Sequence, residues 1–120
     1  MVHVTLGPDT LAIHLSPLDV VFSVHGPFEL PFEHIMGARV EDEHGWRHVW
    51  RKVWGTNAPG IKMAGTFYLP DGLAFLDYST GEECLVIETR HEHYRTIIVQ
   101  TGDEDVESLA AEINRRIRRR

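Results

Sequence analysis

All three tryptophans of this 120-residue chain lie in one short segment, Trp46 to Trp54, together with several basic side chains. At helical spacing the segment has one apolar face and a basic remainder. Indole and guanidinium groups dominate many protein interfaces, and they also anchor proteins in the headgroup layer of anionic membranes. We therefore predict contact with a protein partner, or alternatively with anionic lipid, through Trp46, Arg47, Trp50, Arg51, Lys52 and Trp54.

The same segment also has a purely structural interpretation. Tryptophans bury large apolar areas, so most of these rings could instead pack beneath a β-sheet. An extended conformation would separate the tryptophans from Val49 and Val53, because side chains alternate between the two faces of a strand. The pattern is compatible with a surface anchor and with a core segment.

Eight histidines raise the question of a metal site. In an extended segment His91 and His93 would project to the same side and could bind one ion. Further ligands would have to come from elsewhere in the fold, with His34, His44, His48, Glu88 and Glu92 as the available side chains. No zinc-binding spacing is present, so we predict solvated turn histidines, no metal ligands and no cofactor.

Signals for catalysis are weak. The chain has no Gly-x-Ser-x-Gly elbow, and its glycines and lysines lack phosphate-loop spacing. The acidic runs Glu41 to Glu43 and Glu82 to Glu83 border predicted turns, where solvation explains them. The arginines of 115–120 could touch phosphate or acidic lipid, or form a solubilising helix end. We predict that the protein is not an enzyme.

Composition indicates a single domain over residues 1–120, with 42% hydrophobic and 25% charged residues. The formal net charge of −6 disfavours nonspecific binding to nucleic acid. Cys84 is the one cysteine and lies in an apolar run, which predicts a buried thiol in a reducing compartment. Met1 to Leu6 has no signal-peptide character, so we expect a cytoplasmic protein, or one peripheral to the membrane.

The first half of the chain predicts short strands. Val2 to Leu6 and Thr10 to Leu15 alternate on both sides of a Gly-Pro-Asp turn, which is typical of a hairpin. Leu18 to Val24 is compatible with a short helix or a strand. Phe28 to Phe32 and Ile35 to Val40 are further strand candidates, and Pro31 restricts the first of them to an edge or a bend.

The second half has a clearer pattern. Ile61 to Leu69 alternates with period two, and three further strands follow after short turns, over Leu73 to Tyr78, Cys84 to Arg90 and Tyr94 to Thr101. Short turns favour antiparallel neighbours, so we expect a meander. An amphipathic helix is predicted over about 103–117, with acids at its start, arginines at its end, and an Arg-rich tail at 118–120.

With these elements in place, the chain resembles the bacterial pleckstrin-homology-like (PH-like) domains of uncharacterised proteins. The resemblance covers about residues 28–117 and is carried by the turn-like run Gly55 to Gly60 before the second sheet, Gly65-Thr66-Phe67, and the aromatic strand Leu73 to Tyr78. It implies a mainly β (α+β) fold: an antiparallel β-barrel or bent sandwich of about seven strands with a C-terminal capping helix.

The resemblance implies a noncatalytic scaffold, since the family carries no assigned chemistry and some members look like self-assembling oligomers. Phosphoinositide-reading members of the wider fold place basic residues around the first hairpin, where they hold phosphates. This chain has no Lys or Arg before Arg39, so specific phosphoinositide binding is not expected. The predicted function is a binding or assembly module, acting by protein interaction or self-association.

Overall fold

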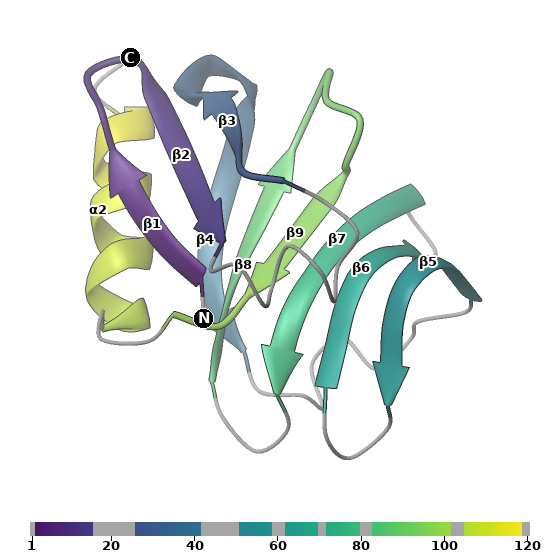
Figure 1. Ribbon diagram of the computed structural model, residues 1–120. Coiled ribbons are helices and arrows are strands. Elements are labelled where there is room, and N and C mark those ends of the chain that lie inside the picture. The colour runs from purple at the N-terminus through teal and green to yellow at the C-terminus, as the bar shows by residue number, and fades with distance from the viewer. Residues whose placement is uncertain are drawn as a thin grey trace.

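The computed structural model describes residues 2–15, 26–41, 51–58, 62–69, 72–79, 83–101 and 105–118. These residues form nine strands, one 3-10 turn and one α-helix (Figure 1). The elements are β1 (Val2–Leu6), β2 (Thr10–Leu15), β3 (Phe28–Pro31), η1 (Phe32–His34), β4 (Ile35–Glu41), β5 (Arg51–Ala58), β6 (Lys62–Leu69), β7 (Gly72–Ser79), β8 (Cys84–Thr89), β9 (Thr96–Val99) and α2 (Val106–Arg118). The nine described strands exceed the expected number of about seven. One of them, β5, begins in a segment for which the sequence left helix and strand open and continues into residues expected to form a turn.

The predicted N-terminal hairpin is confirmed. β1 and β2 pair antiparallel, and the backbone N–H of Gly7 donates to the carbonyl of Thr10 at 2.8 Å to close the turn. β3 pairs with the other side of β2 and completes a three-stranded sheet. Pro31 ends this edge strand, as its missing N–H requires. The candidate element Leu18 to Val24 lies outside the described residues.

The remaining strands form a six-stranded sheet in the order β4-β8-β9-β7-β6-β5. β9 lies between β7 and β8 and runs parallel to β7. The predicted antiparallel meander is therefore wrong at this point, although β5, β6 and β7 do pair antiparallel in chain order. Short turns show only that strand ends are close. They do not decide whether β8 or β9, both buried and apolar, pairs with β7.

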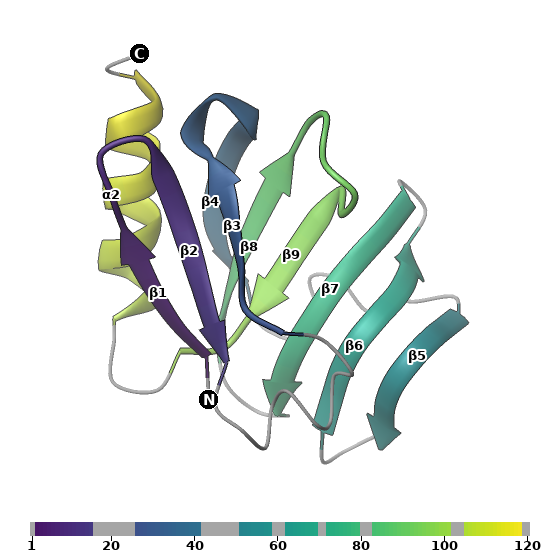
Figure 2. The same cartoon turned by 45° about the horizontal axis from the view of Figure 1, so that its top comes forward.

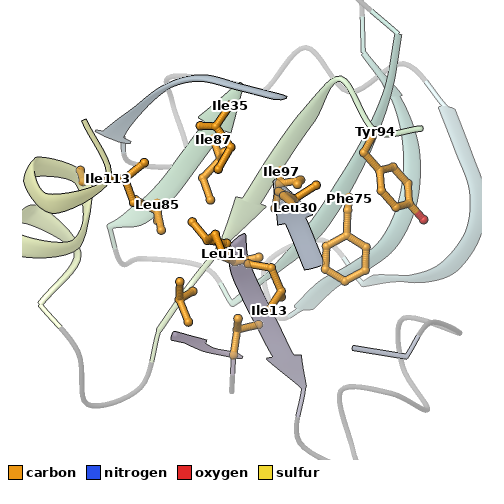
Figure 3. Packing of buried hydrophobic residues seen from close by; sticks show 14 of the residues in the cluster. Leu11, Ile13, Leu30, Ile35, Phe75, Leu85, Ile87, Tyr94, Ile97 and Ile113 are labelled. Carbon is orange, nitrogen blue, oxygen red and sulfur yellow. The ribbon is translucent and has the colours of Figure 1, made fainter. Parts of the chain in front are cut away.

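The main core lies between the two sheets. In Figure 3, Ile13 and Leu30 of the three-stranded sheet lie against Leu85, Ile97 and Phe75 of the larger one, with Ile113 of α2 at one end. Val4 and Ala110 belong to the same cluster. In Figures 1 and 2 the small sheet stands over the β4–β8–β9 half, while β6 and β5 extend beyond it. The prediction left a barrel and a bent sandwich open, and the described strands form two separate sheets that are not closed into a barrel.

The opposite face of the six-stranded sheet is also buried. A second apolar cluster there consists of Phe67, Ala74, Leu76, Cys84, Val86 and Ile98, each with no exposed surface. Strands that are buried on both faces have nearly continuous apolar sequences, as β8 and β9 do. The prediction of a buried thiol at Cys84 is confirmed.

The predicted C-terminal helix is confirmed with a later start, at Val106. Asp105 precedes it and accepts a hydrogen bond from the Ser108 hydroxyl at 2.7 Å. That bond is the main cause that lowers the pKa of Asp105, and backbone N–H groups of the first turn add to it. Residues 103 and 104 lie outside the described residues. In the part of the chain that the structure describes, no helix has the length and apolarity needed to cross a membrane.

A buried hydroxyl pair ties β6 to the turn before β9. Thr66 and Tyr94 share a hydrogen bond of 2.7 Å between their side-chain oxygens, and the Tyr94 ring packs on Phe75. Burial raises the pKa of Tyr94, and the bond from Thr66 offsets part of that rise. The folded state therefore favours the neutral phenol. The neutral phenol of Tyr94 therefore contributes fully to the stability of the fold below about pH 10, the ordinary pKa of tyrosine. That contribution is lost as the pH rises above this value and the phenol ionises.

We expect the urea midpoint of the wild-type protein to fall between pH 8 and pH 11 more steeply than that of Tyr94→Phe. The variant keeps the ring and removes the titrating group, at a cost of about 1 kcal/mol for the lost hydrogen bond at pH 8. Urea unfolding of both proteins across this range measures the difference. Parallel pH profiles for the two proteins would contradict the assigned role of Tyr94.

Candidate functional site

The predicted contact segment is described only in part. Trp46, Arg47 and Trp50 lie outside the described residues. Arg51, Lys52 and Trp54 belong to the backbone of β5, so of the helical and extended conformations that the sequence left open, the described part of the segment has the extended one. The register of β5 against β6 shifts between Lys52 and Trp54, as at a β-bulge. The local sequence could not decide between helix and strand, because tryptophan and valine suit both.

β5 is one edge of the six-stranded sheet, with β6 as its hydrogen-bonded neighbour among the described strands. It is eight residues long and contains no proline. An edge strand presents a row of backbone donors and acceptors on which another extended chain can pair. The structure thus brings three of the six predicted contact residues, Arg51, Lys52 and Trp54, to a sheet edge.

The other edge of this sheet, β4, is closed by α2. The side-chain amide of Asn114 accepts a hydrogen bond from the N–H of Ala38 at 3.0 Å and donates one to the Ala38 carbonyl at 2.8 Å. It therefore satisfies both backbone groups of one β4 residue, as a neighbouring strand would. Sequence reasoning missed Asn114, since a single polar residue on an amphipathic helix gives no signal of a long-range partner.

The two edge strands of the three-stranded sheet, β1 and β3, also have features that limit pairing with another strand. Just after β1, Arg116 donates to the carbonyl of Gly7 at 2.6 Å, and Val2 of β1 forms a bridge with Thr101. On β3, Pro31 has no N–H to offer. Contacts or residues that limit pairing are thus described at the β4 edge, beside β1 and at the end of β3.

Two of the arginines of α2, Arg115 and Arg116, make contacts within the fold. The Arg116 guanidinium lies 5.8 Å from the ring centre of Phe32, in addition to its bond to Gly7. Arg115 forms an ion pair with Glu112 at 2.7 Å. These contacts favour a structural role for the two side chains over phosphate or lipid binding. Arg119 and Arg120 lie outside the described residues.

Comparisons with protein-family models, curated proteins and solved structures returned no match. The described residues of the motifs behind the resemblance to PH-like domains lie in strands of the six-stranded sheet. Gly55 to Ala58 belong to β5 rather than to a turn, and they pair with β6 in the same sheet. The expectation of a turn before a second sheet is therefore wrong for these residues. Gly65 has a φ of 131°, a conformation that glycine adopts without strain.

The structure gathers some of the histidines. His34 of η1 contacts the carboxylate of Glu92 through Nδ1, and the ring of His91 lies 5.9 Å from that of His34. His93 instead stacks on Tyr94, with ring centres 4.9 Å apart. The segment 91–93 is bent, with a φ of 61° at His91, so the extended His91–His93 pair that we considered is not formed. His44 and His48 lie outside the described residues.

Two surface depressions are described on the protein. One, of about 260 Å³, is lined by Ala12, Ile13, His14, Pro27, Phe28 and Glu29. The other, of about 60 Å³, is lined by Met36, Glu88, Thr89, Arg95 and Thr96. Small-molecule sites usually measure roughly 300–1,000 Å³. Both of these depressions are smaller than that range.

Proposed function

We propose that the protein is a noncatalytic interaction module that pairs with an extended segment of a protein partner along β5. The observation that carries this proposal is the asymmetry of the six-stranded sheet. Its β4 edge is closed by Asn114, whereas β5 is an eight-residue edge strand without proline whose described neighbour in the sheet is β6. Backbone pairing would supply affinity, and side chains of the strand would supply selectivity.

The residue types of β5 support an interface. It contains Trp54 and Arg51, and tryptophan and arginine are the residues most enriched at interface positions that dominate binding energy. Lys52 adds a second positive charge, which favours a partner strand with acidic side chains. The preceding residues Trp46, Arg47 and Trp50 extend the same composition along the chain.

We further propose that the scaffold is PH-like. Two sheets, a mainly β composition and a single C-terminal helix are compatible with that assignment. The parallel pair β7–β9 departs from an all-antiparallel arrangement. β5 is an edge strand because of the strand order of the sheet, whether or not the scaffold is PH-like.

Photo-cross-linking tests the surface directly. A photoreactive amino acid at Asn57 of β5 is expected to give a protein adduct in cells. The same group at Glu29, an exposed residue of β3, serves as the matched control and is expected to give none. Adducts of equal yield at both positions, or at Glu29 alone, would contradict the proposed surface.

The cross-linked partner then allows a mutational test. We expect Trp54→Ala to weaken its binding by about 30-fold or more, the equivalent of about 2 kcal/mol for an interface hot spot. The urea midpoint reports whether the variant remains as stable as the wild type. A loss of about 3–5 kcal/mol in stability would instead identify Trp54 as a core residue. Salt-sensitive binding to anionic vesicles, with no protein adduct, would favour the membrane alternative.

A further inference from the structure

The turn between β8 and β9 brings two histidines from distant parts of the chain together. The ring centres of His34 and His91 are 5.9 Å apart, and their planes are inclined by 65°. The side chain of His34 is 29% exposed, and His91 is an exposed residue. Both rings can therefore be reached from solvent while His34 remains held against the protein.

A carboxylate orients one of these rings. Nδ1 of His34 contacts Oε2 of Glu92, whose side chain is 22% exposed. A neutral imidazole that donates its Nδ1 proton to a carboxylate keeps a lone pair on Nε2. Histidines that bind metals commonly have this arrangement, since the carboxylate sets the tautomer and makes the ring a better ligand.

We propose that His34 and His91 bind a divalent transition-metal ion with a preference for imidazole, such as Zn²⁺, Ni²⁺ or Cu²⁺, and that Glu92 positions His34 for it. With metal–nitrogen distances of about 2.0–2.1 Å, two imidazoles on one ion have ring centres about 5–6 Å apart. The observed separation of 5.9 Å lies in this range.

The backbone holds the two histidines in place. The N–H of Arg90 donates to the carbonyl of His34 at 2.8 Å, and the Arg90 guanidinium donates twice to the carbonyl of Glu33 at 3.2 Å. These bonds fasten η1 to the turn. His91 has a φ of 61°, in the left-handed region that residues other than glycine rarely adopt, and such conformations concentrate at functional sites.

The site supplies two protein ligands, and water completes the coordination. Within the described ranges, no group of three or more His, Cys, Asp or Glu side chains is arranged to hold a metal. We therefore expect an accessible ion that exchanges with solvent and binds more weakly than a closed structural zinc. The proposal is independent of any interaction at β5.

A second histidine pair provides an internal comparison. His3 and His14 face each other across β1 and β2, with ring centres 6.0 Å apart. In that pair Nε2 of His14 is hydrogen-bonded to the hydroxyl of Thr5 at 3.1 Å. Ring separation is thus nearly the same in the two pairs, and the contacts described for them differ: a carboxylate at Nδ1 of His34 and a hydroxyl at Nε2 of His14.

Calorimetric titration of the untagged protein with ZnCl₂ at pH 7.5 tests the site. We expect saturable one-to-one binding that His34→Gln and His91→Gln each abolish or weaken at least about tenfold, and that Glu92→Gln weakens about tenfold. His93→Gln and His14→Gln are the matched controls and are expected to bind like the wild type. Broadening of the His34 and His91 ring protons by substoichiometric NiCl₂ locates the ion independently of stability.

Three results would overturn the assignment: no heat of binding and no broadening, wild-type affinity in His34→Gln, or a loss of affinity in His14→Gln equal to that in His34→Gln. The last result would move the ion to the small sheet. Circular dichroism of each variant shows that it is folded, so a loss of binding cannot be attributed to unfolding.

Discussion

Phe75→Ala is expected to lower the free energy of unfolding by about 3–5 kcal/mol. The Phe75 side chain has no exposed surface and lies in the core between the two sheets. Its ring meets that of Phe28 edge-on at 5.2 Å and that of Tyr94 at 5.7 Å. Truncation removes both aromatic contacts and leaves a cavity that rigid sheets on either side cannot fill. Urea denaturation monitored by circular dichroism measures the loss.

Two variants calibrate this result. Phe75→Leu retains part of the buried volume and is expected to lose less stability than Phe75→Ala. Met36→Ala, at a position with 53% exposure, is expected to change stability by less than about 0.5 kcal/mol. If Phe75→Ala cost no more than Met36→Ala, the packing of the small sheet against β7 would be wrong. Small domains are stable by about 5–15 kcal/mol, so the alanine variant approaches the unfolding limit.

Asn114→Ala is expected to cost about 2 kcal/mol, because it removes two hydrogen bonds and leaves both half-buried backbone groups of Ala38 without them. Asn114→Asp is the sharper variant. It keeps an acceptor for the Ala38 N–H but places a carboxylate oxygen opposite the Ala38 carbonyl, so we expect it to cost at least as much as alanine. Thermal and urea unfolding of both variants measure these losses.

Loss of the Asn114 contacts also opens an edge strand. We expect the apparent mass of Asn114→Ala, measured by light scattering, to rise with protein concentration more steeply than that of the wild type. Arg115→Ala is the matched control on the same helix, since it removes an exposed ion pair worth about 0–1 kcal/mol and leaves β4 covered. If both helix variants behaved alike, Asn114 would have no special role in closing the edge.

The sequence was most informative where structure depends on near neighbours. The hairpin of β1 and β2 was predicted with the same bounds that the structure shows. The strand alternation of β6 and the amphipathic face of α2 were also readable, to within a few residues at each end. In each case the side chains repeat with the period of the element, and a turn or cap residue marks where it stops.

The tryptophan segment was harder to predict, because its residue types suit a helix, a strand or a core. Its described part, Arg51 to Trp54, is a strand because β6 offers a long antiparallel partner. The candidate site changed accordingly, from one face of a helix to one edge of a sheet. Arg51, Lys52 and Trp54 remain candidate contact residues, now as members of an edge strand.

The sequence by itself determined that the chain is mainly β, where most strands and the C-terminal helix lie, and that Cys84 is buried. Only the tertiary structure decided that β9 separates β7 from β8, that Asn114 closes β4, and that His34 meets Glu92 and His91. The reason is physical. Periodicity and turns report interactions within a few residues, whereas the choice among equally apolar strands, and the partner of a single polar side chain, depend on burying the whole core at once.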